Sequence, residues 1–425
     1  MRCLSWFLAV ALTGCSAQPF QYLTRPGAGT TGSVEETNAY YAAFTDHPAE
    51  PTLTEWLARR CFFSPGTTSY NPVTTRSAFY YNGSDLGLGR EMRCADCSKD
   101  PKAADSKLIS CVVSNHGIPQ GLDLIQFGHD QRSSVSTALT QLEEFLAGKR
   151  AFRGASVAMD FQPNRADKVR FYIYDASDPA LFSPGNHTPE GLIPGLQLDG
   201  EGLEFNKGVK YIRNCLACHG GRYDADSNRI FGSVFLDFDV SLFTFSDNAM
   251  FGSPPGTAVR AKASVENLDN LRQLNALVRG IAVQTGHPEI IARIDGSYDA
   301  GGVADARSQY VPGYVPTGWP DSQVVRQFDG KNVTAKEYFK SVVHRYCSTC
   351  HFSQSAGNNV TQIDANKPLT FSTWEQWFNN KNFKDGPDGL DVIHRDVCGA
   401  AAMPHAQVTR MNLLRDSTAL SLICN

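Results

Sequence analysis

Two short segments of the chain place two cysteines and a histidine at a fixed spacing, Cys-x-x-Cys-His. In such a segment the first turn of a helix can present both thiols to the two vinyl groups of a haem while the adjacent imidazole reaches the iron. With 12 cysteines and 10 histidines in 425 residues, chance predicts only about 0.008 such segments. The sequence therefore predicts two covalently bound haem c groups, one held by Cys215, Cys218 and His219 and the other by Cys347, Cys350 and His351.

A four-thiolate zinc site built from the same cysteines is the competing interpretation. The two cysteine pairs lie about 130 residues apart, far outside the spacing of zinc ribbons, so haem is favoured. A third pair, Cys94-Ala95-Asp96-Cys97, is followed by Ser98 instead of histidine. We expect this pair to form disulfides rather than to bind haem.

The second haem needs a further axial ligand, for which the sequence offers a methionine. Met403 stands in a Met-Pro pair just before a predicted C-terminal helix. A single methionine is usually core filler, but its position favours ligation here, and His405 is the alternative. A histidine and methionine pair would raise the reduction potential relative to two histidines, which suits an electron carrier.

The first haem has several possible sixth ligands. We expect Met250, which lies in a loop containing Gly and Pro, with His287 and Met159 as alternatives. An iron with an open or displaceable sixth position is a further alternative. His344 and His394 fall on predicted helices, and surface or hydrogen-bonded core histidines are the simpler interpretation of both.

The N-terminus resembles an export signal that ends in a lipidation site. Residues 1–14 combine a positive Arg2 with a short apolar stretch, and Leu12-Thr13-Gly14-Cys15 is similar to the lipobox of bacterial lipoproteins. We expect Cys15 to carry the lipid and residues 15–36, rich in Gly, Thr, Ser and Pro, to form a flexible tether. A plain secretory signal is the alternative. By the lipoprotein sorting rule, Ser16 indicates the periplasmic side of the outer membrane, or the cell surface.

Composition limits the remaining function classes. The net charge is -4 and the isoelectric point is near 6.2, so no basic surface recommends nucleic acid as a partner. No apolar run after the N-terminus approaches the roughly 20 residues that cross a bilayer. Twelve cysteines suit an exported protein. Outside the signal and the haem segments, an even number remains that could form disulfides: Cys61, Cys94, Cys97, Cys111, Cys398 and Cys424. Proximity suggests that Cys398 pairs with Cys424.

The hydrophobic pattern changes along the chain. Strands are predicted at 78–81, before the turn pair Asn82-Gly83, at 108–113 and, half-buried, at 169–174. Helices are predicted at 138–146, at 264–283, after a capping box at Thr334 to Glu337, after a second cap at Ser372 to Glu375, and at 406–422. The expected fold class is α+β: a mixed, strand-containing N-terminal domain (37–205), then two mainly α-helical, cytochrome c-like haem domains (206–330 and 331–425).

With the motifs in place, residues 330–425 resemble a class I cytochrome c domain, because an aromatic-bearing helix, the second haem segment, Met403 and a closing helix follow in order. Residues 206–300 resemble such a domain more loosely. The chain is also similar to a widespread bacterial family of exported proteins with cytochrome c domains, through Ala78 to Asn82 and Cys218 to Gly221. These resemblances imply a dihaem c-type cytochrome lipoprotein and supply no substrate.

Three functions fit these expectations. The first is electron transfer at the cell envelope, with other redox proteins as partners. The second is a dihaem peroxidase-like oxidoreductase, in which one haem is accessible to a small oxidant. In the third, the N-terminal region is a binding module that docks the haem domains to a partner.

Overall fold

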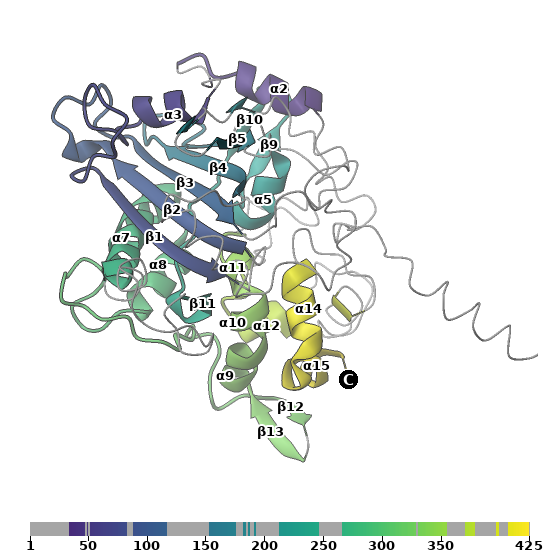
Figure 1. Cartoon of the computed structure of the whole chain (residues 1–425). Helices are drawn as coiled ribbons and strands as arrows, with labels where there is room; N and C mark the ends of the chain where they lie inside the picture. Colours follow the sequence, from purple (N-terminus) through teal and green to yellow (C-terminus); the bar gives the residue numbers. More distant parts are fainter. Residues whose placement is uncertain are drawn as a thin grey trace, which may run out of the picture.

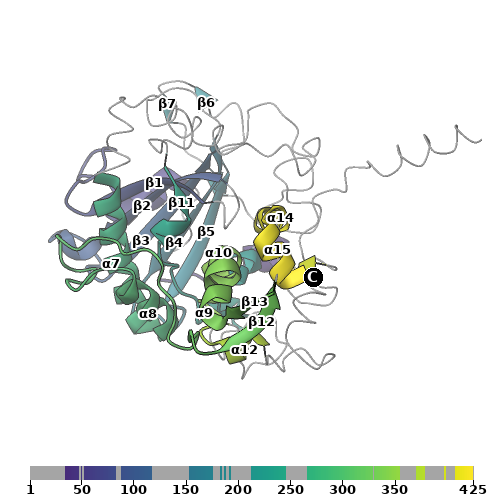
Figure 2. The ribbon, with the colours of Figure 1, turned by 90° about the horizontal axis from the view of Figure 1, so that it is seen from below.

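The fold is mixed α+β, as expected, and its helices pack around one extended antiparallel sheet. The sheet occupies one side of the molecule, and the helices from α9 to the C-terminus gather on the other side (Figures 1 and 2). The computed structural model describes residues 34–46, 49, 52–82, 88–116, 153–175, 182–183, 186–187, 191–192, 212–245, 266–328, 330–354, 370–378, 397–398 and 407–424.

The sheet has the strand order β11-β1-β2-β3-β4-β5-β8. Its long strands are β1 (Thr75–Asn82), β2 (Leu88–Asp96), β3 (Ile109–His116), β4 (Arg153–Phe161) and β5 (Val169–Asp175), and its short edge strands are β8 (Gly191–Leu192) and β11 (Phe243–Thr244). The three strands predicted from the sequence are confirmed as β1, β3 and β5. The turn predicted at Asn82-Gly83 stays untested, because Asn82 still belongs to β1, where it opposes Leu88, and Gly83 lies outside the described residues.

Strand β5 differs from the prediction because both of its faces are buried. The polar side chains expected on a solvent face are instead satisfied internally: Arg170 pairs with Asp167, and the hydroxyl of Tyr172 donates to Asp160. Two helices, α2 (Val34–Ala42) and α3 (Leu53–Arg59), cover this face with aromatic rings. Buried polar groups are tolerated when they are hydrogen-bonded, so a strand with an alternating pattern can lie in the centre of a core.

Side chains bond some of the backbone groups on the outer sides of β5 and β1 that the short edge strands do not reach. On β5, the hydroxyls of Tyr40 and Tyr41 accept from the backbone N–H groups of Phe171 and Ile173. On β1, Asn267 bonds both the N–H and the carbonyl of Phe79. Unpaired strand edges favour association with other chains, and these contacts remove that risk locally.

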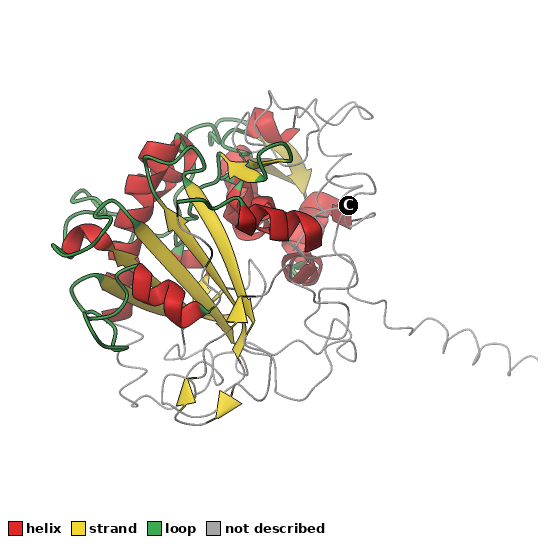
Figure 3. Cartoon of the chain, turned by 90° about the horizontal axis from the view of Figure 1, so that it is seen from above, coloured by secondary structure: helices red, strands yellow, loops and turns green. Residues whose placement is uncertain are grey.

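Helix α7 (Asn267–Thr285) packs against β1 and is followed by α8 (Pro288–Gly296). The predicted apolar face is confirmed, because Leu271, Leu274, Val278 and Ile281 are all buried. Gly286, at a φ of 78°, ends α7 by donating its N–H to Ala282. Figure 3 shows the helices beside the strands.

The C-terminal part is mainly helical, although a hairpin of β12 (Val324–Phe328) and β13 (Lys331–Thr334) precedes it. The predicted capping box is confirmed, since Thr334 and Glu337 bond reciprocally at the start of α9. The chain continues as α9 (Ala335–Tyr338), a π-helical turn (Phe339–Val343), α10 (His344–Tyr346), α11 (Ser348–His351), α12 (Trp374–Phe378), α14 (Gln407–Arg415) and α15 (Ser417–Cys424).

Two helix predictions in this part were wrong in detail. The cap of α12 is Thr373, which bonds reciprocally with Gln376, rather than Ser372 with Glu375. The single helix expected at 406–422 is two helices, because the Asp416 carboxylate accepts from the N–H groups of residues 418 and 419 and starts a new helix.

The remaining short elements lie near the first haem segment or in loops. They are α5 (Arg213–His219), β6 (Phe182–Ser183), β7 (Asn186–His187), β9 (Arg222–Asp224), β10 (Arg229–Phe231), and 3-10 turns at Cys97–Lys99 and Val240–Leu242. The helix predicted at 138–146, the signal and most of the tether lie outside the described residues. Within the described residues, no helix combines the length and apolar character that crossing a bilayer requires.

One cluster of buried side chains extends from the N-terminal helices to α15. Strand β11 also joins the sheet from the segment expected to be the first haem domain. The boundaries expected at 205 and 330 stay predictions. Within the described residues, three disulfides link Cys61 with Cys97, Cys94 with Cys111, and Cys398 with Cys424, the last as proximity suggested.

Candidate functional site

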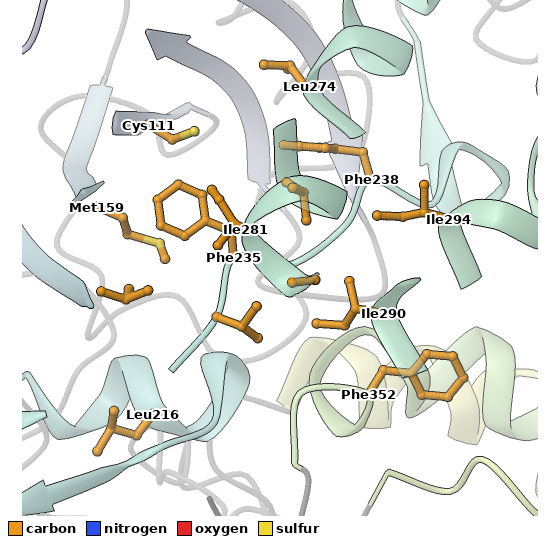
Figure 4. Packing of buried hydrophobic residues seen from close by; sticks show 14 of the residues in the cluster. Cys111, Met159, Leu216, Phe235, Phe238, Leu274, Ile281, Ile290, Ile294 and Phe352 are labelled. Carbon is orange, nitrogen blue, oxygen red and sulfur yellow. The ribbon is translucent and has the colours of Figure 1, made fainter. Parts of the chain in front are cut away.

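Helix α5 carries the first Cys-x-x-Cys-His segment. Cys215 and Cys218 are three residues apart and therefore lie on one face of the helix. Leu216 turns into the core and anchors α5 against it, as Figure 4 shows. The helix ends directly after the histidine, where the N–H of Gly220 donates to the carbonyl of Leu216.

Two glycines follow His219, and each occupies a position that no other residue would fit. Gly220 has a φ of 66°, and a Cβ atom there would lie 2.3 Å from the carbonyl oxygen of Ser353. Gly221 has a φ of 89°, and its Cβ atom would lie 2.4 Å from the hydroxyl of Ser233. The backbone thus approaches two other segments closely at this point.

The imidazole of His219 is oriented by the backbone of Val234. In the tautomer protonated at Nδ1, this nitrogen donates to the Val234 carbonyl oxygen at 2.9 Å. The N–H of Val234 donates in turn to the carbonyl of His219 at 3.0 Å. That tautomer places the lone pair on Nε2, and a bond from the other ring nitrogen to a carbonyl is the usual way in which a metal-binding histidine is oriented. The ring also packs against Phe171 of β5, with centroids 5.4 Å apart.

The second segment lies where α10 passes into α11. The hydroxyl of Ser348 donates to the carbonyl of His344, which fixes the start of α11. The ring of His351 stacks on Phe371 with centroids 4.2 Å apart. Trp319 holds Phe371 in place, since its indole N–H donates to the Phe371 carbonyl at 2.9 Å.

Buried aromatic rings surround this second segment. Trp319 stacks on Tyr338, and Trp377 lies edge-on to Tyr338 and Phe371. All four rings are buried, and through Phe371 they form an apolar surface against which the half-buried His351 packs.

The fold brings the two segments into contact. The Sγ atoms of Cys218 and Cys350 lie 3.2 Å apart, and helices α5 and α11 pack side by side (Figure 1). The hydroxyl of Ser353 contacts the carbonyls of both cysteines, and the side chain of Gln354 donates to the Leu216 carbonyl at 3.2 Å. The residues just after His351 therefore hold the backbone of the first segment.

None of the four segment cysteines forms a disulfide. Burial raises the pKa of the Cys215 thiol to about 12, with a further contribution from Cys218. Burial alone raises the pKa of Cys347 to about 12. Both sites favour an uncharged sulfur, which a thioether provides.

The contact between the segments removes the argument from sequence separation against a zinc site. Within the described residues, however, no three cysteine, histidine, aspartate or glutamate side chains converge as metal ligands. All four cysteines belong to that part of the chain. The zinc interpretation therefore gains no support from the geometry.

Of the expected sixth ligands, Met403 and Met250 lie outside the described residues, as do Cys15, His405 and His394. His287 is fully buried at the start of α8, where its Nδ1 contacts the hydroxyl of Thr285 at 3.1 Å. Burial lowers its pKa to about 4, although the nearby backbone of Gly232 opposes this shift. The ring is therefore neutral at pH 7, and its Nε2 has no hydrogen-bond partner among the described residues.

Met159 belongs to the apolar cluster beneath the sheet, together with Phe235 and Leu216 (Figure 4). Core packing accounts for this side chain. His344 bonds the carboxylate of Asp239 at 2.7 Å, which agrees with its interpretation as a hydrogen-bonded histidine.

Sequence reasoning missed Val234, Ser353 and Arg293, the last of which donates to the carbonyl of Ser348 at 3.0 Å. The Gly-Gly pair after His219 was the one sequence signal of close backbone contact near the site. The other contacts arise between distant segments and leave no local pattern.

Comparison with known proteins assigns the chain to no family. No protein-family model matches it, and neither a curated protein nor a solved structure shows significant similarity.

Proposed function

We propose that this protein is a dihaem c-type cytochrome that transfers electrons at the bacterial cell envelope. The observation that carries the proposal is the contact between the two Cys-x-x-Cys-His segments through Cys218 and Cys350. A segment that merely resembled a haem motif by chance would not need to lie beside a second one. Two adjacent attachment points are what a relay between two redox centres requires.

The side chains at the site fit the group that the motifs imply. Cys215 and Cys347 lie in surroundings that favour neutral sulfur, and the bond from His219 to Val234 orients a neutral imidazole. A bound haem would supply a one-electron iron couple. The chain would contribute the two ligands His219 and His351, aromatic packing that excludes water, and hydrogen bonds that fix both segments.

The finer parts of the proposal rest on the sequence. They are class I cytochrome c-like character for the C-terminal region, Met403 and Met250 as the sixth ligands, lipidation at Cys15, location at the periplasmic side of the outer membrane or at the cell surface, and other redox proteins as partners. The mainly helical character of the chain from α9 to α15 supports the first of these.

A reductive titration of the purified protein tests the function. The protein should be made in a host that matures c-type cytochromes and titrated anaerobically while its visible spectrum is recorded. We expect two electrons per chain to be taken up and returned to an added one-electron acceptor. Uptake of no electrons would contradict the proposal. Turnover of added peroxide would instead favour the peroxidase-like alternative.

A further inference from the structure

One extended segment, residues 234–239, contacts the first haem segment directly and the second through Arg293. Its first residue, Val234, holds His219 as described above. Three residues further on, the Asp237 carboxylate forms an ion pair with Arg293 of α8. The two haem segments are thus connected through a single stretch of backbone and one buried guanidinium.

Arg293 contacts the second haem segment at both of its ends. Its Nη1 donates to the carbonyl of Ser348, which follows Cys347 directly, at 3.0 Å. Its guanidinium also lies over the ring of Phe352, which follows His351, at 4.3 Å from the centroid.

The ion pair is removed from water, because the side chains of Arg293 and Asp237 are 2% and 3% exposed. Charges act over a longer range in such surroundings, since little solvent screens them. As a pair they nearly cancel. The loss of either partner would therefore leave the other without its main countercharge, beside the backbone that carries His351.

We propose that Arg293 and Asp237 are positioning residues whose balanced charges set the reduction potential of the iron bound at His351. This inference rests on the proposed function, because it needs a haem at the second segment. Net charge and hydrogen bonding near a haem are known means of adjusting its potential. An extra positive charge favours the reduced iron, and an extra negative charge favours the oxidised iron.

Other charged groups lie close to the pair and remain unchanged in the test below. Asp239 accepts hydrogen bonds from His344, Tyr310 and Ser241. Asp239 also interacts electrostatically with Arg293, and it does so equally in the wild type and in the variants that keep Arg293.

The experiment measures both reduction potentials in the haem-loaded full chain. Asp237→Asn should raise one of the two potentials, and the double variant should return it close to the wild-type value. Burial raises the pKa of Asp237 even beside Arg293, so the variants are compared at high pH, where the lone carboxylate stays ionised and Arg293→Gln should lower the same potential. A purely structural role predicts no such opposite signs. Arg293→Lys keeps the positive charge and should leave the potential unchanged.

The matched control is the ion pair between Arg279 of α7 and Asp295 of α8, which also involves α8 but is exposed, at 39% and 44%. Arg279→Gln and Asp295→Asn should leave both potentials unchanged because solvent screens them. Shifts of equal sign in the two buried single variants, or no shift, would overturn the inference.

If Arg293→Gln fails to fold, Asp237→Asn decides, because it keeps Arg293 and its bond to Ser348. An unchanged or lowered potential in this variant contradicts charge balance. A wild-type protein without haem would refute the proposed function itself. A haem-loaded protein whose potentials ignore these changes would refute only this inference.

Discussion

The Sγ atoms of Cys218 and Cys350 lie 3.2 Å apart, although 132 residues separate the two cysteines. This contact depends on a backbone that approaches very closely, because the carbonyl of Ser353 occupies the space that a side chain at position 220 would fill. The adjacency of the two segments is therefore a property of specific backbone positions, and it can be tested by substitution.

Gly220→Ala should separate the two segments. The new Cβ atom would meet the Ser353 carbonyl at 2.3 Å, and the φ of 66° is unfavourable for alanine. We expect a loss of more than about 3 kcal/mol in the free energy of unfolding, measured by urea denaturation.

Gly66→Ala is the matched control for this change. Gly66 has a similar φ of 75°, but a Cβ atom added there would meet no other atom within 4 Å. This variant should lose only about 1 kcal/mol, which is the cost of the left-handed backbone. Equal losses in the two variants would show that the contact with Ser353 does not matter.

Asp416 should contribute to stability through both of its oxygens. Oδ1 caps α15, while Oδ2 accepts from Arg345 and from the hydroxyl of Tyr346, just before the second haem segment. Asp416→Ala should cost about 2 kcal/mol on urea unfolding, and Asp416→Asn about half of that because it keeps the cap. An asparagine variant as unstable as the alanine variant would contradict these separate roles of Oδ1 and Oδ2.

The N-terminal core should lose stability in acid through Asp160. Burial raises the pKa of this carboxyl, but Arg165 and Arg60 outweigh burial and hold the pKa at about 2. Because the folded-state pKa lies below the unfolded value, the stabilisation is present above about pH 4 and is lost as the pH falls towards 2. The lowered pKa of Asp160 contributes about 2 kcal/mol to the free energy of unfolding at neutral pH.

The comparison of wild type with Asp160→Asn across pH isolates this effect. The difference in unfolding free energy should be constant from pH 7 to about pH 5 and should shrink below about pH 4. A difference that stays constant down to pH 2.5 would mean that Asp160 does not titrate in this range.

The disulfides can be mapped directly. Peptide mapping without reduction should recover the pairs Cys61–Cys97, Cys94–Cys111 and Cys398–Cys424. Loss of the last pair, by Cys398→Ala with Cys424→Ala, should cost about 3 kcal/mol because it frees a loop of 26 residues at the C-terminus. A disulfide between a haem-segment cysteine and any of these six would contradict the arrangement.

Periodicity and capping signals predicted much of the local structure. The face of Leu271 to Ile281 and the cap at Thr334 both depend on residues within a few positions of one another. Local energetics favours such features before any tertiary contact forms. The α+β class followed from the same signals.

The rest depended on contacts between distant residues. The alternating pattern of β5 predicts a solvent-facing polar side, because nothing near Tyr172 in the sequence indicates that Asp160 and Trp56 will cover it. The division at Asp416 was missed because an aspartate within a helical pattern also suits an exposed helix position.

In the candidate site, too, the local features were predicted and the contacts between distant residues were not. The two motifs are local patterns and were found, while their contact and the bond from His219 to Val234 exist only in the fold. The carbonyl that orients His219 is a backbone group, which every residue possesses and which leaves no signature in the sequence.

Intact-mass spectrometry of the mature protein, from a host that matures c-type cytochromes, tests covalent haem attachment most directly. The wild type should carry the added mass of two haems. The pair of changes Cys215→Ala and Cys218→Ala should remove one, and Cys347→Ala with Cys350→Ala should remove the other. A wild-type polypeptide with no added haem and no red colour would contradict the assignment of both segments.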